Sequence, residues 1–251
     1  MSAVRYQVNN AIAEIVLDRP ERRNALNDEM VEGLLSALHQ AQDDASARIV
    51  LLRATGETFC AGADLKSGGV QPREGEQPFV TLLRTMWNLP KPIVGCISGS
   101  AFGGGLGLIA ACDLTVAAAE AQFAFSEVRI GVVPAMISVV VIPKIGIHNA
   151  MWLFLTGERF SAEQARQMGL VHRVCPRVEL DATVEDVLSQ LRLAGPVALQ
   201  HAKELVRRVP HMNMDDAFRY TSALIAQLFS SAEALEGMQA FAEKRKPSWA
   251  L

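Results

Sequence analysis

Short apolar segments of strand length alternate with amphipathic segments of helix length through the first three quarters of the chain. Residues 4–8 and 12–17 have the pattern of two strands, and Asn9-Asn10 between them tolerates the positive φ of a hairpin turn. Three further segments have the length and apolar content of buried strands: 48–54, 93–98 and 114–119. The pattern therefore predicts a set of short strands, most of them buried.

Apolar residues recur at helical spacing between these strands. Asn27 or Asp28 caps a helix that runs to about residue 39. The apolar stripe of this helix consists of Met30, Leu34, Leu35 and Leu38. A second helix is expected over about 79–87, and a third runs from a glycine-rich turn to Ala111. Because short strands alternate with helices, the pattern predicts an α/β fold.

The pattern changes after about residue 190 of the chain. Residues 196–208, 214–230 and 231–245 have helical periodicity, and no strand pattern separates them. We therefore predict two parts, an α/β core over residues 1–190 and a C-terminal helical region over residues 191–251.

Composition and charge narrow the possible functions. Net charge is −3 and no block of lysine or arginine is present, so nothing favours nucleic-acid binding. The four cysteines form no CxxC pair and no histidine cluster accompanies them, which indicates reduced thiols in a cytoplasmic protein and no metal site. The stretch between Lys91 and Asp113 is uncharged and long enough to cross a bilayer. Its proline and six glycines instead favour a strand, a turn and a helix in a soluble core, so no membrane association is expected.

Two turns of small residues follow predicted strands and are candidates for binding an anion. Ser100–Gly107 opens a helix, so its backbone N–H groups and the helix dipole favour an anion or a developing oxyanion. Phe59–Lys66 follows the strand at 48–54 and also exposes backbone N–H groups. Taken alone, the first turn is equally compatible with a tightly packed corner between a strand and a helix. Taken alone, the second is also compatible with a turn at a strand end that Asp64 caps locally.

Glu127 is a lone acid in a mostly apolar neighbourhood. Burial there would raise its pKa toward the range useful for proton transfer, whereas an exposed Glu127 would pair with Arg129. Glu74 and Glu76 lie in the polar segment 66–78, whose Gly and Pro content favours a mobile surface loop with solvated acids.

The order and spacing of these features resemble the enoyl-CoA hydratase/isomerase (crotonase) family over essentially the whole chain. The family's xRNAL segment, AGAD-like loop, GGG turn and catalytic Glu region correspond to Glu21–Leu26, Ala61–Asp64, Gly103–Gly105 and the region of Glu127. Further matching segments are Leu155–Glu158, Gly169–Val171 and Glu236–Trp249. The resemblance implies a crotonase-like spiral of repeated ββα units, followed by a C-terminal helical region that forms trimer contacts.

By this resemblance the chain is an enzyme that acts on an acyl-CoA thioester, with CoA entering as part of the substrate and no separate cofactor. The resemblance assigns the backbone N–H groups of Ala63 and Gly104 to an oxyanion hole and Glu127 to acid–base catalysis. It assigns CoA and substrate contacts to Arg23, Ala25, Leu26, Ala61, Asp64, Leu65, Lys66, Phe241 and Lys244. It further implies a homotrimer or a dimer of trimers, in which the last two residues complete a CoA site, either their own or a neighbour's.

The sequence departs from the family pattern at Gly107. Family hydratases of the two-glutamate type carry one Glu there and the other 20 residues later, where this chain has Glu127. Three functions remain open: hydration of a 2-enoyl-CoA, Δ3–Δ2 isomerisation of an enoyl-CoA with a single Glu base, and acyl-CoA binding with little catalysis. Residues 126–138 (SEVRIGVVPAMIS) resemble hydratases of branched or glutaconyl-type acyl-CoAs, which favours the first.

Overall fold

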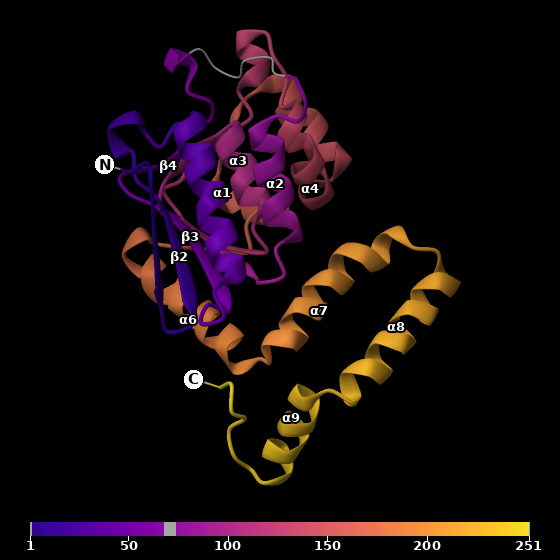
Figure 1. Ribbon diagram of the computed structural model, residues 1–251. Coiled ribbons are helices and arrows are strands. Elements are labelled where there is room, and N and C mark those ends of the chain that lie inside the picture. The colour runs from indigo at the N-terminus through magenta and orange to yellow at the C-terminus, as the bar shows by residue number, and fades with distance from the viewer. Residues whose placement is uncertain (1, 68–73, 251) are drawn as a thin grey trace.

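Two sheets of mostly parallel strands form the framework of the protein (Figure 1). The computed structural model describes residues 2–67 and 74–250. Over these residues, the larger sheet has six strands in the order β1-β2-β3-β5-β7-β10, and the smaller has four in the order β4-β6-β8-β9. One pair in each sheet is antiparallel, β1 with β2 and β8 with β9, and the other pairs are parallel.

From β3 to β8, successive strands belong alternately to the larger and the smaller sheet. The strands are β1 (Val4–Asn9), β2 (Ile12–Leu17), β3 (Ile49–Ala54), β4 (Thr58–Cys60), β5 (Ile93–Ile97), β6 (Ser100–Phe102), β7 (Leu114–Ala118), β8 (Gln122–Ala124), β9 (Arg159–Ser161) and β10 (Arg173–Cys175). The helices are α1 (Asp28–Asp43), α2 (Pro78–Asn88), α3 (Gly104–Ala111), α4 (Ala135–Thr156), α5 (Ala162–Gln167), α6 (Leu180–Leu193), α7 (Pro196–Arg208), α8 (Met214–Phe229) and α9 (Ala232–Ala242). The successive units β3-β4-α2, β5-β6-α3 and β7-β8-α4 form the expected spiral of ββα repeats.

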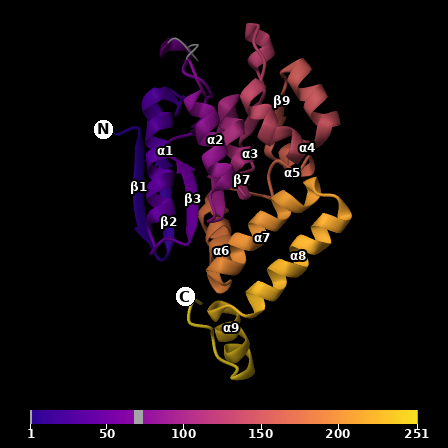
Figure 2. The ribbon, with the colours of Figure 1, turned by 45° about the vertical axis from the view of Figure 1, so that its right-hand side comes forward.

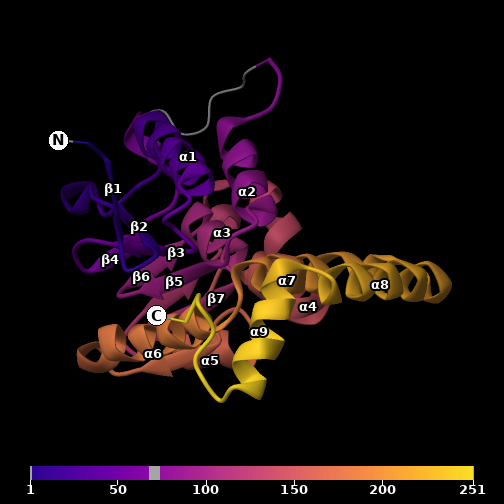
Figure 3. The same ribbon diagram turned by 60° about the horizontal axis from the view of Figure 1, so that its bottom comes forward.

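Helices cover both faces of the six-stranded sheet (Figure 3). The larger apolar core lies between the sheet and α1 to α4, and a smaller one lies between the sheet and α6. Helix α3 is at the centre of the larger core, since every residue from Gly105 to Ala111 is buried. A helix that is apolar on all sides is stable only in such a position.

The strands and helices expected from the apolar pattern are present, but some helix bounds differ and three helices were not expected. Helix α1 is capped by Asn27 as predicted, but it continues to Asp43 rather than to about residue 39, and α9 ends at Ala242 rather than at about residue 245. Helices α4, α5 and α6 occupy residues to which the sequence pattern assigned no element. The predicted mobile loop at 66–78 falls partly on residues 68–73, which lie outside the described residues.

Helix α4 is the one helix in the described part of the chain that is long and apolar enough to cross a membrane by length and composition. Its buried residues include Ile137, Val140 and Val141, and the helix packs against α3 and α2. Its backbone breaks at Gly146, where φ is 75°. The stretch from Lys91 to Asp113, which has no charge between its ends, forms β5, β6 and α3 in the core, as predicted.

The C-terminal helices α7, α8 and α9 extend away from the core (Figures 1 and 2). Helix α7 is attached through Asp113, whose carboxylate forms ion pairs with Lys203 at 2.7 Å and Arg207 at 2.6 Å. The end of the chain returns to the core, where Arg48 Nη1 donates a hydrogen bond of 2.5 Å to the carbonyl oxygen of Trp249. The tail is therefore held at both of its ends, with α8 between them.

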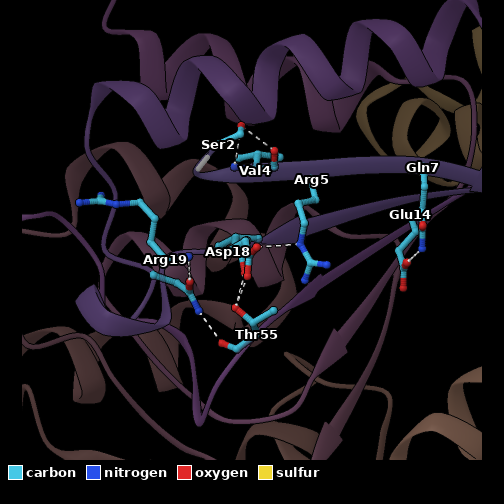
Figure 4. A network of polar contacts seen from close by, with 10 residues as sticks. Ser2, Val4, Arg5, Gln7, Glu14, Asp18, Arg19 and Thr55 are labelled. Carbon is cyan, nitrogen blue, oxygen red and sulfur yellow. Dashed lines mark hydrogen bonds and ion pairs between the residues drawn. The ribbon is translucent and has the colours of Figure 1, made fainter.

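A single buried side chain, Asn24, holds the segment before α1. Its Oδ1 accepts the N–H of Arg19 at 2.8 Å, and its Nδ2 donates to the carbonyl oxygens of Thr55 and Thr58, each at 2.9 Å. Asn24 has no exposed surface and a φ of 53°, a left-handed conformation that Asn tolerates better than most residues. Beside it, Asp18 accepts a hydrogen bond from the Thr55 hydroxyl (Figure 4).

Replacing Asn24 with Ala should destabilise the protein, because three partly buried backbone groups lose their partner at once. We expect the free energy of unfolding to fall by about 2–4 kcal/mol, measured by urea denaturation. Asn9→Ala, at an exposed position at the end of β1, is the control and should change it by less than about 0.5 kcal/mol. Equal effects of the two substitutions would contradict the role given to Asn24.

Candidate active site

The RRNAL segment (Arg22–Leu26) and the AGAD segment (Ala61–Asp64) lie side by side and are joined by backbone hydrogen bonds. The N–H of Leu26 donates to the carbonyl oxygen of Gly62 at 2.8 Å, and the N–H of Asp64 donates to the carbonyl oxygen of Leu26 at 2.9 Å. This is a parallel bridge between Leu26 and Ala63. Because the bridge uses the groups on either side of Ala63, the N–H of Ala63 itself points away from Leu26.

The AGAD segment also packs against the turn that opens α3. Strands β4 and β6 pair in parallel, so the residues that follow them leave the sheet at the same edge. A Cβ on Gly62 would lie 2.8 Å from the carbonyl oxygen of Phe102 and 3.6 Å from the nitrogen of Gly104, and Gly62 has a φ of 84°. Only glycine allows this approach, which brings Ala63 close to Gly104.

Gly104 is the first residue of α3, and Gly103 before it has a positive φ of 49°. The first N–H groups of a helix have no acceptor within the helix, and the helix dipole places partial positive charge there. Neighbouring groups are already paired, since the N–H of Gly103 donates to Ala124 at 3.1 Å. The N–H groups of Ala63 and Gly104 are thus available in the described structure to a bound oxygen atom.

Glu127 faces the same turn. It follows β8, which pairs with β6, and begins a short 3-10 helix (Glu127–Ile130). A Cβ on Gly103 would lie 3.0 Å from Glu127 Oε1, and Oε2 is buried without a hydrogen-bond partner among the described residues. Burial raises the pKa of the Glu127 carboxyl above its ordinary value. The alternative pair with Arg129 is not formed, because that guanidinium donates to the Thr156 carbonyl oxygen at 3.4 Å.

A cavity of about 590 Å³ joins these groups. The predicted site residues that line it are Leu26, Ala61, Ala63, Asp64, Leu65, Gly104 and Glu127. Two available backbone donors beside one partly buried carboxyl can polarise a carbonyl group and move a proton at an adjacent carbon.

The other predicted contact residues do not line this cavity. Ala25 precedes Leu26 in the RRNAL segment and is buried, whereas Arg23 of the same segment and Lys66, which follows Leu65, are exposed. Phe241, which is 87% exposed, belongs to α9, and Lys244 follows that helix. Helix α9 lies far from α1 and α3 within the same chain (Figure 1).

The sequence analysis missed the apolar wall of the cavity. This wall comes from α2, from the segment between Glu127 and α4, and from the start of α4. It includes Phe79, Ile130, Val132, Val133, Pro134, Met136 and Ile137. The Phe79 ring lies 3.4 Å from the position that a Cβ on Gly104 would take. The uninterrupted apolar run from Ile130 to Ile137 was the available signal, since ligand pockets are lined predominantly by apolar side chains.

Gly107 and Ile137 are packed so closely that the position of one side chain limits the size of the other. A Cβ on Gly107 would lie 2.4 Å from Ile137 Cγ2 and 3.1 Å from Ile137 Cβ. Ile137 is 3% exposed and is fixed at the start of α4. No side chain larger than hydrogen fits at Gly107 while Ile137 keeps its place.

The acids of the polar segment 66–78 and His172 lie elsewhere. Glu76 pairs with Arg84 at the surface, and Glu74 is exposed. His172 contacts Thr115, with His172 Nδ1 3.1 Å from the Thr115 hydroxyl oxygen. Within residues 2–67 and 74–250, no group of three or more His, Cys, Asp or Glu side chains could hold a metal ion. All four cysteines are free and buried, and burial raises the pKa of Cys60 to about 12.

Comparison with known proteins identifies the family to which this site is similar. The family model described as enoyl-CoA hydratase/isomerase matches residues 7–250. A protein of Salmonella typhi named carnitinyl-CoA dehydratase is 36% identical over 256 residues, which cover 96% of this chain and 95% of that protein.

Solved structures agree with this match over the whole fold. An enoyl-CoA hydratase from Shewanella pealeana superposes with a TM-score of 0.91 at 31% identity, covering 98% of this chain and 96% of the other. Pseudomonas aeruginosa AtuE superposes with a TM-score of 0.93 at 33% identity, covering 99% of this chain and all (100%) of the other.

The contact between Gly107 and Ile137 predicts strong coupling between substitutions at the two positions. Gly107→Ala alone should lower the free energy of unfolding by about 1–3 kcal/mol, because the new methyl group overlaps Ile137 Cγ2. In an Ile137→Ala background the same change should cost much less, since the overlapping atoms are gone. Urea denaturation of the four proteins measures the coupling. Additive effects would show that the contact is not as close as described.

Proposed function

The chain belongs to the enoyl-CoA hydratase/isomerase family, and we propose that it is an enoyl-CoA hydratase that adds water across the C2–C3 double bond of an enoyl-CoA thioester. The observation that carries the proposal is the position of Glu127. Its partly buried carboxyl, with a raised pKa, lies against the turn at Gly103 that begins α3 and lines one cavity with Ala63 and Gly104.

The two backbone N–H groups act as an oxyanion hole in this proposal. They donate hydrogen bonds to the thioester oxygen, on which negative charge develops as an enolate forms. One such donor lowers a reaction barrier by about 3 kcal/mol when it is held in place before the reaction. The parallel bridge at Leu26 and the close packing of Gly62 hold Ala63 in this way.

Glu127 performs both proton transfers of the hydration. As a carboxylate it takes a proton from water while the hydroxide oxygen bonds to C3, and the electron pair of the double bond moves onto the thioester oxygen. The enolate then collapses and C2 takes the proton from Glu127. The raised pKa suits a group that must both accept and return a proton.

A second candidate is Δ3–Δ2 enoyl-CoA isomerisation, which needs one base to move a proton from C4 to C2. The observation that favours it is the side chain of Ile137, which occupies the space beside Gly107 and leaves Glu127 as the acid that contacts the turn at Gly103. Both reactions pass through the same enolate, so the oxyanion hole serves either. Acyl-CoA binding with little catalysis is the third possibility.

The CoA part of the substrate is proposed to lie along the RRNAL and AGAD segments. Arg23 and Lys66 are exposed next to these segments, where their charges suit the phosphates of CoA. Phe241 and Lys244 lie far from this cavity in their own chain, so we propose that they complete the CoA site of a neighbouring subunit. We place the protein in the cytoplasm on the basis of its free cysteines.

Glu127→Gln should lower kcat by about 10²–10⁴-fold, the usual contribution of general acid–base catalysis, while CoA-thioester binding changes little. Steady-state kinetics and calorimetry with acetoacetyl-CoA separate the two effects. Glu74→Gln, which removes an exposed acid in the same way, is the control and should retain full activity. Full activity of Glu127→Gln would remove Glu127 from the mechanism.

The same substitution should increase thermal stability at neutral pH. As pH rises from about 4, the unfolded chain loses the Glu127 proton first, because burial holds the folded-state pKa higher. The wild-type folded state therefore loses stability up to that raised pKa, whereas Gln does not titrate. Calorimetric melting should show a Tm difference that is absent in acid and grows with pH. A difference independent of pH would contradict the buried carboxyl.

Offering the wild-type enzyme a 2-enoyl-CoA and a 3-enoyl-CoA separately tests which reaction occurs. Hydration removes the absorbance of the conjugated enoyl group from the first, whereas isomerisation creates that absorbance from the second. We expect the first result. The second result alone would assign the isomerase, and the absence of both would leave acyl-CoA binding as the function.

Assembly as a trimer or a dimer of trimers is proposed from the apolar surface of the tail. Large exposed side chains on α8 and α9 are Met214, Phe218, Ile225, Phe229, Leu235, Met238 and Phe241. Contiguous exposed apolar side chains usually mark an interface. Light scattering at micromolar concentration should give the mass of three or six chains, and the mass of one chain would contradict the proposal.

A further inference from the structure

The tail, residues 194–250, buries few of its residues although it contains three helices (Figure 2). Its buried residues are Gly195, Leu224 and Ala240, and α7 has none. Helices in proteins are usually held in place by the packing of an apolar face. Because this tail has so little of that packing, its polar contacts with the core must fix its direction.

One side chain of the core, Arg48, contacts both ends of the tail. Arg48 directly precedes β3. Its Nη2 donates a hydrogen bond of 2.6 Å to the carbonyl oxygen of Ala194, where the tail begins, and its Nη1 donates one of 2.5 Å to that of Trp249, where the tail ends. Trp249 Nε1 in turn donates to the carbonyl oxygen of Leu193 at 3.2 Å. The planar guanidinium holds two acceptors in a fixed relation to each other, so it fastens the two ends together.

Glu233, in the first turn of α9, belongs to the same junction. Its carboxylate accepts the N–H groups of Val197 and Ala198, each at 2.9 Å. These groups are in the first turn of α7, where they have no acceptor within the helix and where negative charge is favoured. A Cβ on Gly195 would overlap Glu233 Oε1. Burial lowers the pKa of the Arg48 guanidinium, and the nearby Glu233 carboxylate opposes this effect. The starts of α7 and α9 and the end of the chain therefore meet at Arg48.

The junction encloses the part of the tail that carries Phe241 and Lys244. Both residues lie between Glu233 and Trp249 in the sequence, and both of these flanking residues contact the junction. The Trp249 ring also packs on α9, since a Cβ on Gly237 would lie 3.1 Å from it. A change at the junction would therefore shift Phe241 and Lys244 together.

We propose that Arg48 is a positioning residue, which fastens both ends of the tail and so holds Phe241 and Lys244 in place for the CoA site of a neighbouring subunit. The proposal rests on the role proposed above for these two residues. The ion pairs of Asp113 hold α7 but do not reach α9. Loss of the Arg48 contacts would therefore release α9 and the end of the chain.

Hydrogen exchange and ligand binding on the full-length protein test the proposal separately from catalysis. The variants are Arg48→Ala and the conservative Arg48→Lys. The matched control is Arg177→Ala, because Arg177 also donates to a backbone carbonyl group, that of Gly56 at 3.3 Å, but within the core. Calorimetry measures butyryl-CoA, a saturated thioester that cannot be hydrated, and the binding stoichiometry gives the folded fraction. Each variant is also made in a background that carries Phe241→Ala and Lys244→Ala.

Arg48→Ala should make amide exchange at residues 194–198 and 232–249 at least about tenfold faster and leave β3 unchanged. It should weaken butyryl-CoA binding at least about fivefold, because side chains that are no longer held in place must be ordered on binding. Arg48→Lys should have smaller effects, since its ammonium group lacks the fork, and Arg177→Ala should have neither effect. In the background without Phe241 and Lys244, Arg48→Ala should not weaken binding further.

Unchanged exchange in the tail of Arg48→Ala would overturn the inference. Additive losses of binding in the Phe241 and Lys244 background would also overturn it, because they would show a general loss of structure rather than a positioning role. If substitution of Phe241 and Lys244 leaves butyryl-CoA binding unchanged, their proposed place in a CoA site is wrong. Faster exchange in the tail would then still support the hold of Arg48 on its two ends.

Discussion

The candidate site depends on one constraint, the parallel pairing that makes β4 and β6 end at the same edge of the small sheet. Because the strands run in the same direction, the AGAD segment and the turn before α3 leave the sheet together. Gly62 then allows the two backbones to approach, and the bridge at Leu26 turns the N–H of Ala63 toward the side on which α3 begins. Asn24 secures the other side of this bridge from a fully buried position.

The pairing of strands in the small sheet also places the Glu127 carboxyl where its burial lowers the stability of the folded protein. Strand β8 continues the small sheet beside β6, so the chain that leaves it delivers Glu127 to the start of α3. Burial there opposes ionisation of the carboxyl, and the close contact with Gly103 leaves no space for a side chain. Burial therefore moves the pKa of this carboxyl toward the range useful for proton transfer, which it does not do for an exposed glutamate.

The order of the short motifs, through their resemblance to the enoyl-CoA hydratase/isomerase family, predicted which segments meet, whereas each motif alone encodes only a local conformation. Glycines such as Gly103–Gly105 indicate a tight turn, and a polar residue such as Asn27 indicates the start of a helix, in any fold. Helix α4 and its wall residue Ile137 could not be predicted in this way. An apolar run has no helical period to read, and the contact between Ile137 and Gly107 joins positions that only the folded core brings together. The role proposed for Phe241 and Lys244 requires a second subunit, which a single sequence does not place.

The central claim is that Ala63 and Gly104 stabilise an enolate, and the acidity of bound acetoacetyl-CoA tests it most directly. This ligand forms an enolate whose absorbance reports its ionisation, and Glu127→Gln provides a binding site without the competing carboxylate. The account predicts that the pKa of the bound ligand is lower than that of the free ligand, since two backbone donors favour the anion. A bound pKa equal to or higher than the free value would show that the two N–H groups do not form an oxyanion hole.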